Sequence, residues 1–255
     1  MVLTVENLSK NFKGLKAVNN LSISLGEEEI VGIIGPNGAG KTTIFNLITG
    51  LLTSEPKSKI TFLDEDITLT PSYKIARKGI SRTFQKIQLF SHLSVLENVV
   101  IGAQKNNESG FLSTMFNGPK FRENEQRIKE YAISILELFH ISDLYNQIAG
   151  DLPYGTQRMV EIARAMASKP KLILLDEPVA GMNSEESISL SENIKDMKKR
   201  FKVTILLVEH DMSFVMGLCE RIIVVNYGVK IAEGEPEKIR NHQGVIEAYL
   251  GRQKC

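Results

Sequence analysis

The sequence predicts an α/β fold: a mostly parallel sheet flanked by helices, with an N-terminal antiparallel β subdomain and an inserted α-helical subdomain. Three observations predict it. The first sixty residues alternate apolar and polar side chains, four later runs are apolar throughout, and helical periodicity dominates residues 93–169. We expect one domain over 1–255, in which 1–92 and 170–255 form the core and 93–169 the helical subdomain.

The bulk composition favours a globular protein of the cytosol. Hydrophobic residues make up 42% of the chain, and the formal net charge of +1 gives no general attraction to nucleic acid or acidic lipid. Cys219 and Cys255 form no disulfide framework. The first residues do not resemble a signal peptide, and no segment approaches the ~20 apolar residues that span a bilayer.

Two kinds of strand pattern are present. Leu21–Leu25 and Lys59–Phe62 alternate, which is typical of antiparallel strands with one buried face. Runs without alternation suit parallel strands that are buried on both faces. These runs are Ile30–Ile34, Leu172–Leu175, Ile205–Val208 and Ile222–Val225.

The remaining elements are helical or turn-like. Apolar residues from Ile128 to Phe139 recur at spacings of three and four and predict one helix face. Residues 106–120 lack a period and predict an exposed excursion. Val225–Val229 predicts a hairpin turn, and Pro236 opens a predicted last helix.

A glycine-rich segment directly after the Ile30–Ile34 strand matches the Walker A pattern. Its amides and the following helix end predict a phosphate site, with Lys41 on the β and γ phosphates of ATP and Thr42 on Mg²⁺. A plain turn before a helix is the alternative, but it needs no Lys-Thr at this offset. The segment is Gly35, Pro36, Asn37, Gly38, Ala39, Gly40, Lys41, Thr42 and Thr43.

Adjacent carboxylates follow the apolar run at 172–175. Adjacent side chains on a strand point to opposite faces, so Asp176 and Glu177 can do different work. We expect Asp176 to hold Mg²⁺ through its water shell and Glu177 to polarise the attacking water. A helix cap is the structural alternative for such a pair.

Further segments occur in the order and rough spacing of an ABC ATPase, a class of P-loop NTPase, and the resemblance runs over nearly the whole chain. They are Arg82–Gln85, Leu152–Arg158, Ala180–Asn183 and Val208–Asp211. The resemblance implies that Phe12 stacks on adenine and that Gln85 contacts Mg²⁺ and the attacking water. It also implies that His210 hydrogen-bonds the γ phosphate. The structural alternatives are an apolar core role for Phe12, a surface position for Gln85 and a helix cap for His210.

The signature segment implies a composite site, because in this family it closes on ATP held by a second ABC ATPase subunit. A helix beginning near Gln157 would aim its amides at that phosphate. The sequence departs from Leu-Ser-Gly-Gly-Gln, with Pro153, Tyr154, Gly155, Thr156 and Gln157 in the segment. Pro153 donates no hydrogen bond, so hydrolysis is expected to be slower or asymmetric. Asn183 stands where the family often has Asp in its contact across the dimer.

Within the family, the Tyr-Gly signature, the stretch from Gly110 to Glu123 and the ending Val245–Gly251 resemble ATPases of branched-chain amino-acid importers. This resemblance implies transmembrane permease subunits, an indirect link to an extracytoplasmic solute-binding protein, and a place on the cytoplasmic face of the membrane. The alternatives are the ATPase of a lipid or lipopolysaccharide exporter, a soluble ABC ATPase on nucleic acid or ribosomes, and a regulatory module with little turnover. The balanced charge and the single cassette indicate that nucleic acid is not a partner.

Overall fold

The structure is a computed structural model that describes residues 1–104 and 119–250. The excursion predicted at 106–120 lies, apart from its last two residues, outside the described residues.

The antiparallel sheet predicted for the first part of the chain is confirmed. Its strand order is β2-β1-β4-β5, and the alternating residues of β2 and β4 place their apolar side chains inward. The strands are β1 (Leu3–Phe12), β2 (Leu15–Leu25), β4 (Lys59–Phe62) and β5 (Glu65–Asp66).

The second sheet has the order β10-β9-β3-β8-β7-β6 and is parallel except at its β10 edge. All four predicted apolar runs lie in it, and every residue of β3, β7 and β8 is buried, as expected of strands covered on both faces. The strands are β3 (Ile30–Ile34), β6 (Ile80–Arg82), β7 (Leu172–Asp176), β8 (Thr204–Val208), β9 (Arg221–Asn226) and β10 (Val229–Gly234).

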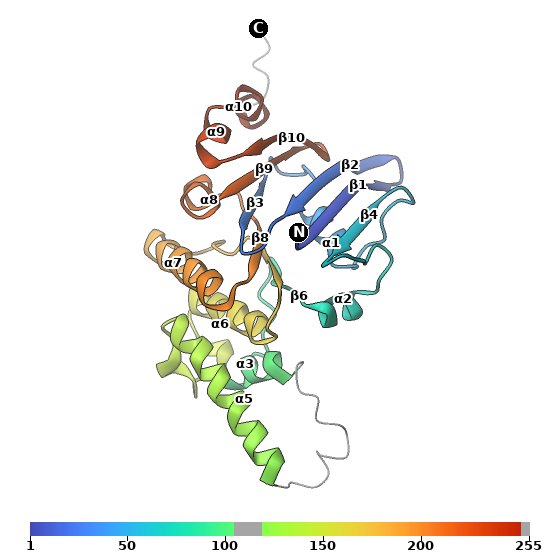
Figure 1. The fold of residues 1–255 in the computed structure, drawn as a ribbon. Coiled ribbons are helices and arrows are strands. Elements are labelled where there is room, and N and C mark those ends of the chain that lie inside the picture. The colour runs from blue at the N-terminus through green and yellow to red at the C-terminus, as the bar shows by residue number, and fades with distance from the viewer. Residues whose placement is uncertain (105–118, 251–255) are drawn as a thin grey trace.

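The helices lie around this sheet. Those within residues 95–138 form one end of the molecule, and the last two helices of the described chain lie at the opposite end (Figure 1). They are α1 (Lys41–Ile48), α2 (Ser72–Lys78), α3 (Val95–Gln104), α5 (Pro119–Leu138), α6 (Tyr154–Ala167), α7 (Ser184–Phe201), α8 (Met212–Leu218), α9 (Pro236–Arg240) and α10 (Gln243–Leu250). Two short 3-10 turns, Ser142–Leu144 and Ala149–Asp151, lead from α5 to α6.

Two helix predictions need correction. The signature helix α6 begins at Tyr154, three residues before the predicted start near Gln157. The ring of Pro153 fixes the φ of this extended N-cap residue directly before the helix. Pro236 opens α9 as predicted, but α9 has only five residues and α10 follows it.

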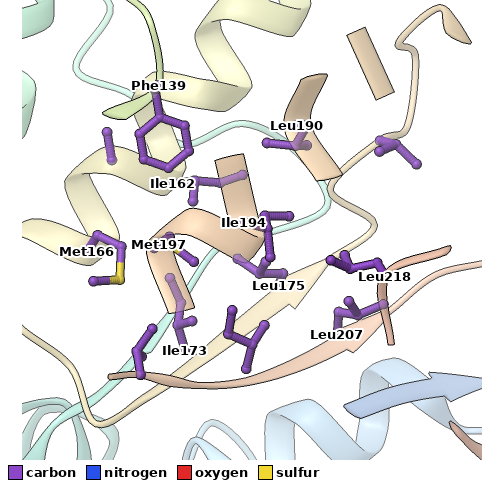
Figure 2. Packing of buried hydrophobic residues seen from close by; sticks show 14 of the residues in the cluster. Phe139, Ile162, Met166, Ile173, Leu175, Leu190, Ile194, Met197, Leu207 and Leu218 are labelled. Carbon is purple, nitrogen blue, oxygen red and sulfur yellow. The ribbon is translucent and has the colours of Figure 1, made fainter. Parts of the chain in front are cut away.

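The core joins the sheet to the helical part of the chain. Side chains of α6 and α7 pack against those of β7 and β8, and Phe139 at the end of α5 extends the cluster (Figure 2). The predicted α5 face is confirmed by the burial of Ala132, Ile135 and Phe139. The signature helix is therefore fixed on the same strands whose ends carry the predicted catalytic residues.

Within residues 1–104 and 119–250, no helix has the length and apolar character needed to cross a bilayer.

Candidate functional site

The loop between β3 and α1 has a shape that only glycine allows at two positions. Gly35 has φ +157°, and a Cβ there would lie 2.0 Å from the Val225 carbonyl oxygen. Gly40 has φ +99°, and its Cβ would lie 2.3 Å from the Ala17 carbonyl oxygen. Backbone atoms cannot withdraw as a flexible side chain can, so both glycines hold the loop close against neighbouring strands.

Lys41, the first residue of α1, is only 8% exposed and turns back into this loop. Its Nζ donates to the carbonyl oxygens of Gly35, at 2.6 Å, and Pro36, at 3.1 Å. Burial lowers the pKa of Lys41, while the carboxylates of Glu177, Asp176 and Glu209 act in the opposite direction. One lysine and three acids thus share one corner of the molecule.

The two carboxylates after β7 differ in backbone as well as in environment. Asp176 is the last strand residue and is buried, whereas Glu177 lies beyond the strand with φ +49°. The prediction that both side chains alternate along one strand is therefore wrong. The Glu177 amide donates to the Val208 carbonyl oxygen at 2.9 Å, which stabilises this left-handed residue beside the end of β8.

Gln85 meets Glu177 directly. Its Nε2 donates to Glu177 Oε2 at 3.0 Å, although the two residues are 92 positions apart in the chain. The parallel pairing of β6 with β7 explains this approach, because the segments that follow the two strands leave the same edge of the sheet.

His210 follows β8 at this edge, and its side chain is 60% exposed. Its neighbour Glu209, absent from the predicted site, is fully buried. The Glu209 carboxylate accepts from the amides of Val179, at 3.0 Å, and of His210, at 2.8 Å. It ties the turn after Glu177 to the turn that carries the histidine, and its position after an apolar strand was the available sequence signal.

The first turn of α6 presents the signature residues. The Gln157 amide donates to the Pro153 carbonyl oxygen at 2.9 Å, so the helix hydrogen-bond series begins there. The amides of Tyr154, Gly155 and Thr156 precede that first bond and form the positive end of the helix dipole. The Gln157 side chain instead donates to the carbonyl oxygens of Leu152 and Gly150.

Signature residues also contact the turn that contains Asn183. A Cβ on Gly155 would lie 2.7 Å from Glu186 Oε1, and a Cβ on Gly181 would lie 3.2 Å from the Tyr154 ring. Asn183 caps α7, because its side chain accepts from the Glu186 amide and the Glu186 carboxylate accepts from the Asn183 amide. These contacts give Tyr154 and Asn183 packing and capping roles within one chain.

Arg158 is a buried residue that the sequence patterns did not single out. Its guanidinium donates to the carbonyl oxygens of Phe84 and Gln85 at 2.6 and 2.8 Å, and to Glu161 Oε2 at 2.7 Å. Glu161 in turn accepts from the Gln88 amide. This pair fastens α6 to the Gln85 segment. Arg82, which pairs with Asp176, was missed in the same way.

Phe12 ends β1 with 41% of its surface exposed. Residue Ala17 of the paired strand β2 lies against Gly40, so the hairpin that carries Phe12 reaches the loop before α1. The Lys10 ammonium lies 5.5 Å from the centre of this ring, and the exposed part of the ring is available for stacking.

A groove of about 730 Å³ opens between the core and the helical part of the chain. The Gln85 segment lines it with Phe84, Gln88, Leu89 and Phe90, and Arg164 lies on its other wall. The Arg164 guanidinium stands 5.5 Å from the centre of the Phe90 ring. The lining is thus partly apolar and partly aromatic, and it also includes the charged residues Arg82, Glu161 and Arg164.

The chemistry of these groups fits a nucleotide triphosphate and a hard divalent cation. Loop amides and the buried Lys41 ammonium suit phosphate oxygens. The Thr42 hydroxyl and the Gln85 amide oxygen are oxygen ligands of the kind that Mg²⁺ takes, and the Asp176 carboxylate suits a water of its shell.

Two family sequence models match parts of the chain. The sequence model of the ABC transporter family matches residues 18–180, and that of the branched-chain amino acid ATP-binding cassette transporter matches 229–254.

Two curated relatives and one solved structure cover nearly the whole chain. The chain is 43% identical to the high-affinity branched-chain amino acid transport ATP-binding protein BraF of Pseudomonas aeruginosa and 42% identical to LivG of Escherichia coli, with 98% of each chain covered. It is 35% identical, with a TM-score of 0.84 and 98% of both chains covered, to the ADP conformation of an ATP-binding cassette of an ABC transporter.

Proposed function

Because the chain belongs to the ABC transporter family, we propose that it is the ATP-hydrolysing subunit of a transporter that takes up branched-chain amino acids. The single observation that carries the proposal is the meeting of Lys41, Asp176 and the Gln85–Glu177 pair at one edge of the parallel sheet. The match of the C-terminal residues 229–254 favours the amino-acid cargo over the lipid or lipopolysaccharide exporter alternative.

The phosphate end of ATP is assigned to the loop before α1. Lys41 and the loop amides hold the β and γ phosphates, and Phe12 stacks on the base. The lysine already lies inside the loop within hydrogen-bond distance of two carbonyl oxygens, so only a small side-chain movement turns it toward phosphate.

Hydrolysis is assigned to Glu177, with Gln85 as its partner. Glu177 polarises the attacking water as general base, and the Gln85 amide holds one of its carboxylate oxygens in place. His210 donates to the γ phosphate, and Glu209 fixes the turn on which it stands. Mg²⁺ held by Thr42, Gln85 and, through water, Asp176 would neutralise charge on the phosphates.

A second ABC ATPase subunit completes the site in this proposal. The free amides of Tyr154, Gly155 and Thr156 cover the γ phosphate bound by the partner subunit, and Asn183 meets the partner close by. Pro153 adds no donor, so the helix end supplies this contact. The proposal divides the chain into a core (1–92 and 170–255) and a helical subdomain (93–169), and the signature lies at the start of α6 in that subdomain.

Permease subunits are proposed to dock in the groove beside Leu89 and Phe90, which places the protein at the cytoplasmic face of the membrane. The link from groove to chemistry is short, because Gln85 is four residues from Leu89 and touches Glu177. An extracytoplasmic solute-binding protein acts through the permease, and the proposal includes no nucleic-acid partner.

The test is the ATPase rate of the chain purified with its membrane subunits. Leucine, isoleucine or valine, presented with the solute-binding protein, should raise the rate, and Lys41→Ala in the same complex should abolish the response. A rate raised by lipid but by no amino acid would support the exporter alternative. A rate raised only by nucleic acid would overturn the transport assignment.

A further inference from the structure

Arg82 begins the segment Arg82–Gln85, but the sequence motifs assign no function to its side chain. It is the last residue of β6, three positions before Gln85, and its side chain is 6% exposed. Its Nη2 donates to Asp176 Oδ2 at 2.7 Å, and the Asp176 side chain is 3% exposed. The carboxylate assigned to magnesium is thus also one half of a buried ion pair.

The same guanidinium is anchored on the helix that begins with Lys41. Arg82 Nη1 donates to Asn46 Oδ1 at 2.7 Å and to Thr49 Oγ1 at 3.3 Å. Both acceptors belong to α1 or its C-terminal cap. Arg82 therefore joins the end of β7 to α1 through one planar group. These two elements carry Asp176 and Thr42, both assigned to the proposed magnesium site.

Two aromatic rings confine the guanidinium further. Its central carbon lies 5.4 Å from the centre of the Phe45 ring and 5.1 Å from that of Phe84. Its Nε is buried and has no hydrogen-bond partner among the described residues. A buried cation with an unsatisfied N–H costs stability, so packing alone does not account for an arginine at this position.

We propose that Arg82 is a positioning residue for the magnesium site: it holds Asp176 by one carboxylate oxygen and fixes it relative to α1. The guanidinium binds Oδ2, which restricts the rotamer of Asp176 and leaves Oδ1 outside this ion pair. The inference rests on the proposed magnesium role of Asp176 and Thr42. Neighbours of this kind orient metal ligands without touching the metal.

The experiment compares nucleotide affinity with and without magnesium. The dissociation constant of a fluorescent ADP analogue is measured by titration in excess Mg²⁺ and in EDTA, for the wild type and for Arg82→Lys. Lysine keeps the charge but cannot bridge Asp176, Asn46 and Thr49 at once. We expect the gain in affinity from Mg²⁺ to fall about 10- to 100-fold, the usual effect of altering such a neighbour, while the affinity in EDTA stays within a factor of about three.

Three variants frame that result. Asn46→Ala removes one anchor of Arg82 without touching Asp176, and a smaller loss of the magnesium effect is expected. Arg77→Lys on the exposed face of α2 is the matched control and should behave as the wild type. Arg82→Met, if it folds, should lose at least as much of the magnesium effect as Arg82→Lys.

The outcomes separate the inference from the function on which it depends. Asp176→Asn should abolish the magnesium effect. If the wild type shows no such effect, the proposed magnesium site itself fails. If the wild type and Asp176→Asn behave as expected but Arg82→Lys keeps the full effect, only the positioning role is overturned. An equal loss of affinity in Mg²⁺ and in EDTA would likewise overturn it, because it would show a general structural role.

Discussion

The Gln85 side chain donates a hydrogen bond to the Glu177 carboxylate, Nε2 to Oε2 at 3.0 Å. The first residue belongs to the segment that lines the groove, and the second is the proposed general base. A displacement of the groove segment therefore acts on the base through a single contact. The predictions that follow test the chemistry at this contact and the packing that supports it.

Glu177→Gln should bind ATP with near wild-type affinity, accumulate as a closed dimer with its partner ATPase, and hydrolyse ATP about 10²- to 10⁴-fold more slowly. The amide keeps the size of the side chain but cannot accept a proton. Turnover assays and size-exclusion chromatography with light scattering measure both effects. The exposed Glu185→Gln in the first turn of α7 is the control, and an undiminished rate in Glu177→Gln would remove this residue from the base role.

Lys41→Ala should lose nucleotide binding. Among the described residues, Lys41 is the cation that hydrogen-bonds to the loop carbonyl oxygens of Gly35 and Pro36, so its removal takes the positive charge for the phosphates out of the loop. Titration with a fluorescent ATP analogue measures the loss. The variant should stay folded by circular dichroism, and the exposed Lys57→Ala should bind as the wild type does. Unchanged affinity in Lys41→Ala would place the phosphates elsewhere.

Arg158→Met should lower the free energy of unfolding by about 3–5 kcal/mol, because it leaves the Glu161 carboxylate buried without its partner. The double variant Arg158→Met, Glu161→Leu removes both charges and should recover much of that loss. Urea unfolding of the two variants and the wild type measures the difference. If the single variant were as stable as the wild type, the pair would not fasten α6 to the Gln85 segment.

Sequence patterns predicted the elements whose structure is set by residues close together in the chain. Continuous apolar runs are confirmed as β3, β7 and β8, because a strand that is buried on both faces needs apolar residues at every position. The spacing from Gly35 to Lys41 likewise predicted a tight loop between a strand and a helix, since a short loop encodes its own geometry.

Features that depend on partners far away in the chain could not be predicted from the sequence. Arg82, Arg158 and Glu209 have the pattern of ordinary charged residues, and each makes hydrogen bonds to partners far away in the chain that the pattern does not reveal. The left-handed Glu177 depends on its bond to Val208 in the neighbouring segment. The strand β6 has only three residues, too few to show a period.

Cys219 provides a test of the core by pH. Burial raises the pKa of its thiol to about 12, and Glu220 and Glu209 act in the same direction. The unfolded thiol loses its proton near its ordinary value while the folded one keeps it, so stability is complete at lower pH and is lost as the pH rises from about 9 towards 12.

The stability advantage of the wild type over Cys219→Ala, both in a Cys255→Ser background, should therefore fall by about 1 kcal/mol between pH 9 and 10. Urea unfolding at each pH measures it, and the alanine variant cancels the titration of all other groups. A constant difference across this interval would contradict the burial of the thiol.

The crystal structure of Glu177→Gln with its partner ATPase, ATP and Mg²⁺ tests the central claim most directly. The account predicts that the γ phosphate lies between two subunits. Lys41 and the loop amides of one subunit contact it from one side, and the first turn of the other subunit's signature helix covers it from the other. Where this chain provides that turn, the contacting amides are those of residues 154–156. A triphosphate enclosed by groups of one subunit alone would contradict it.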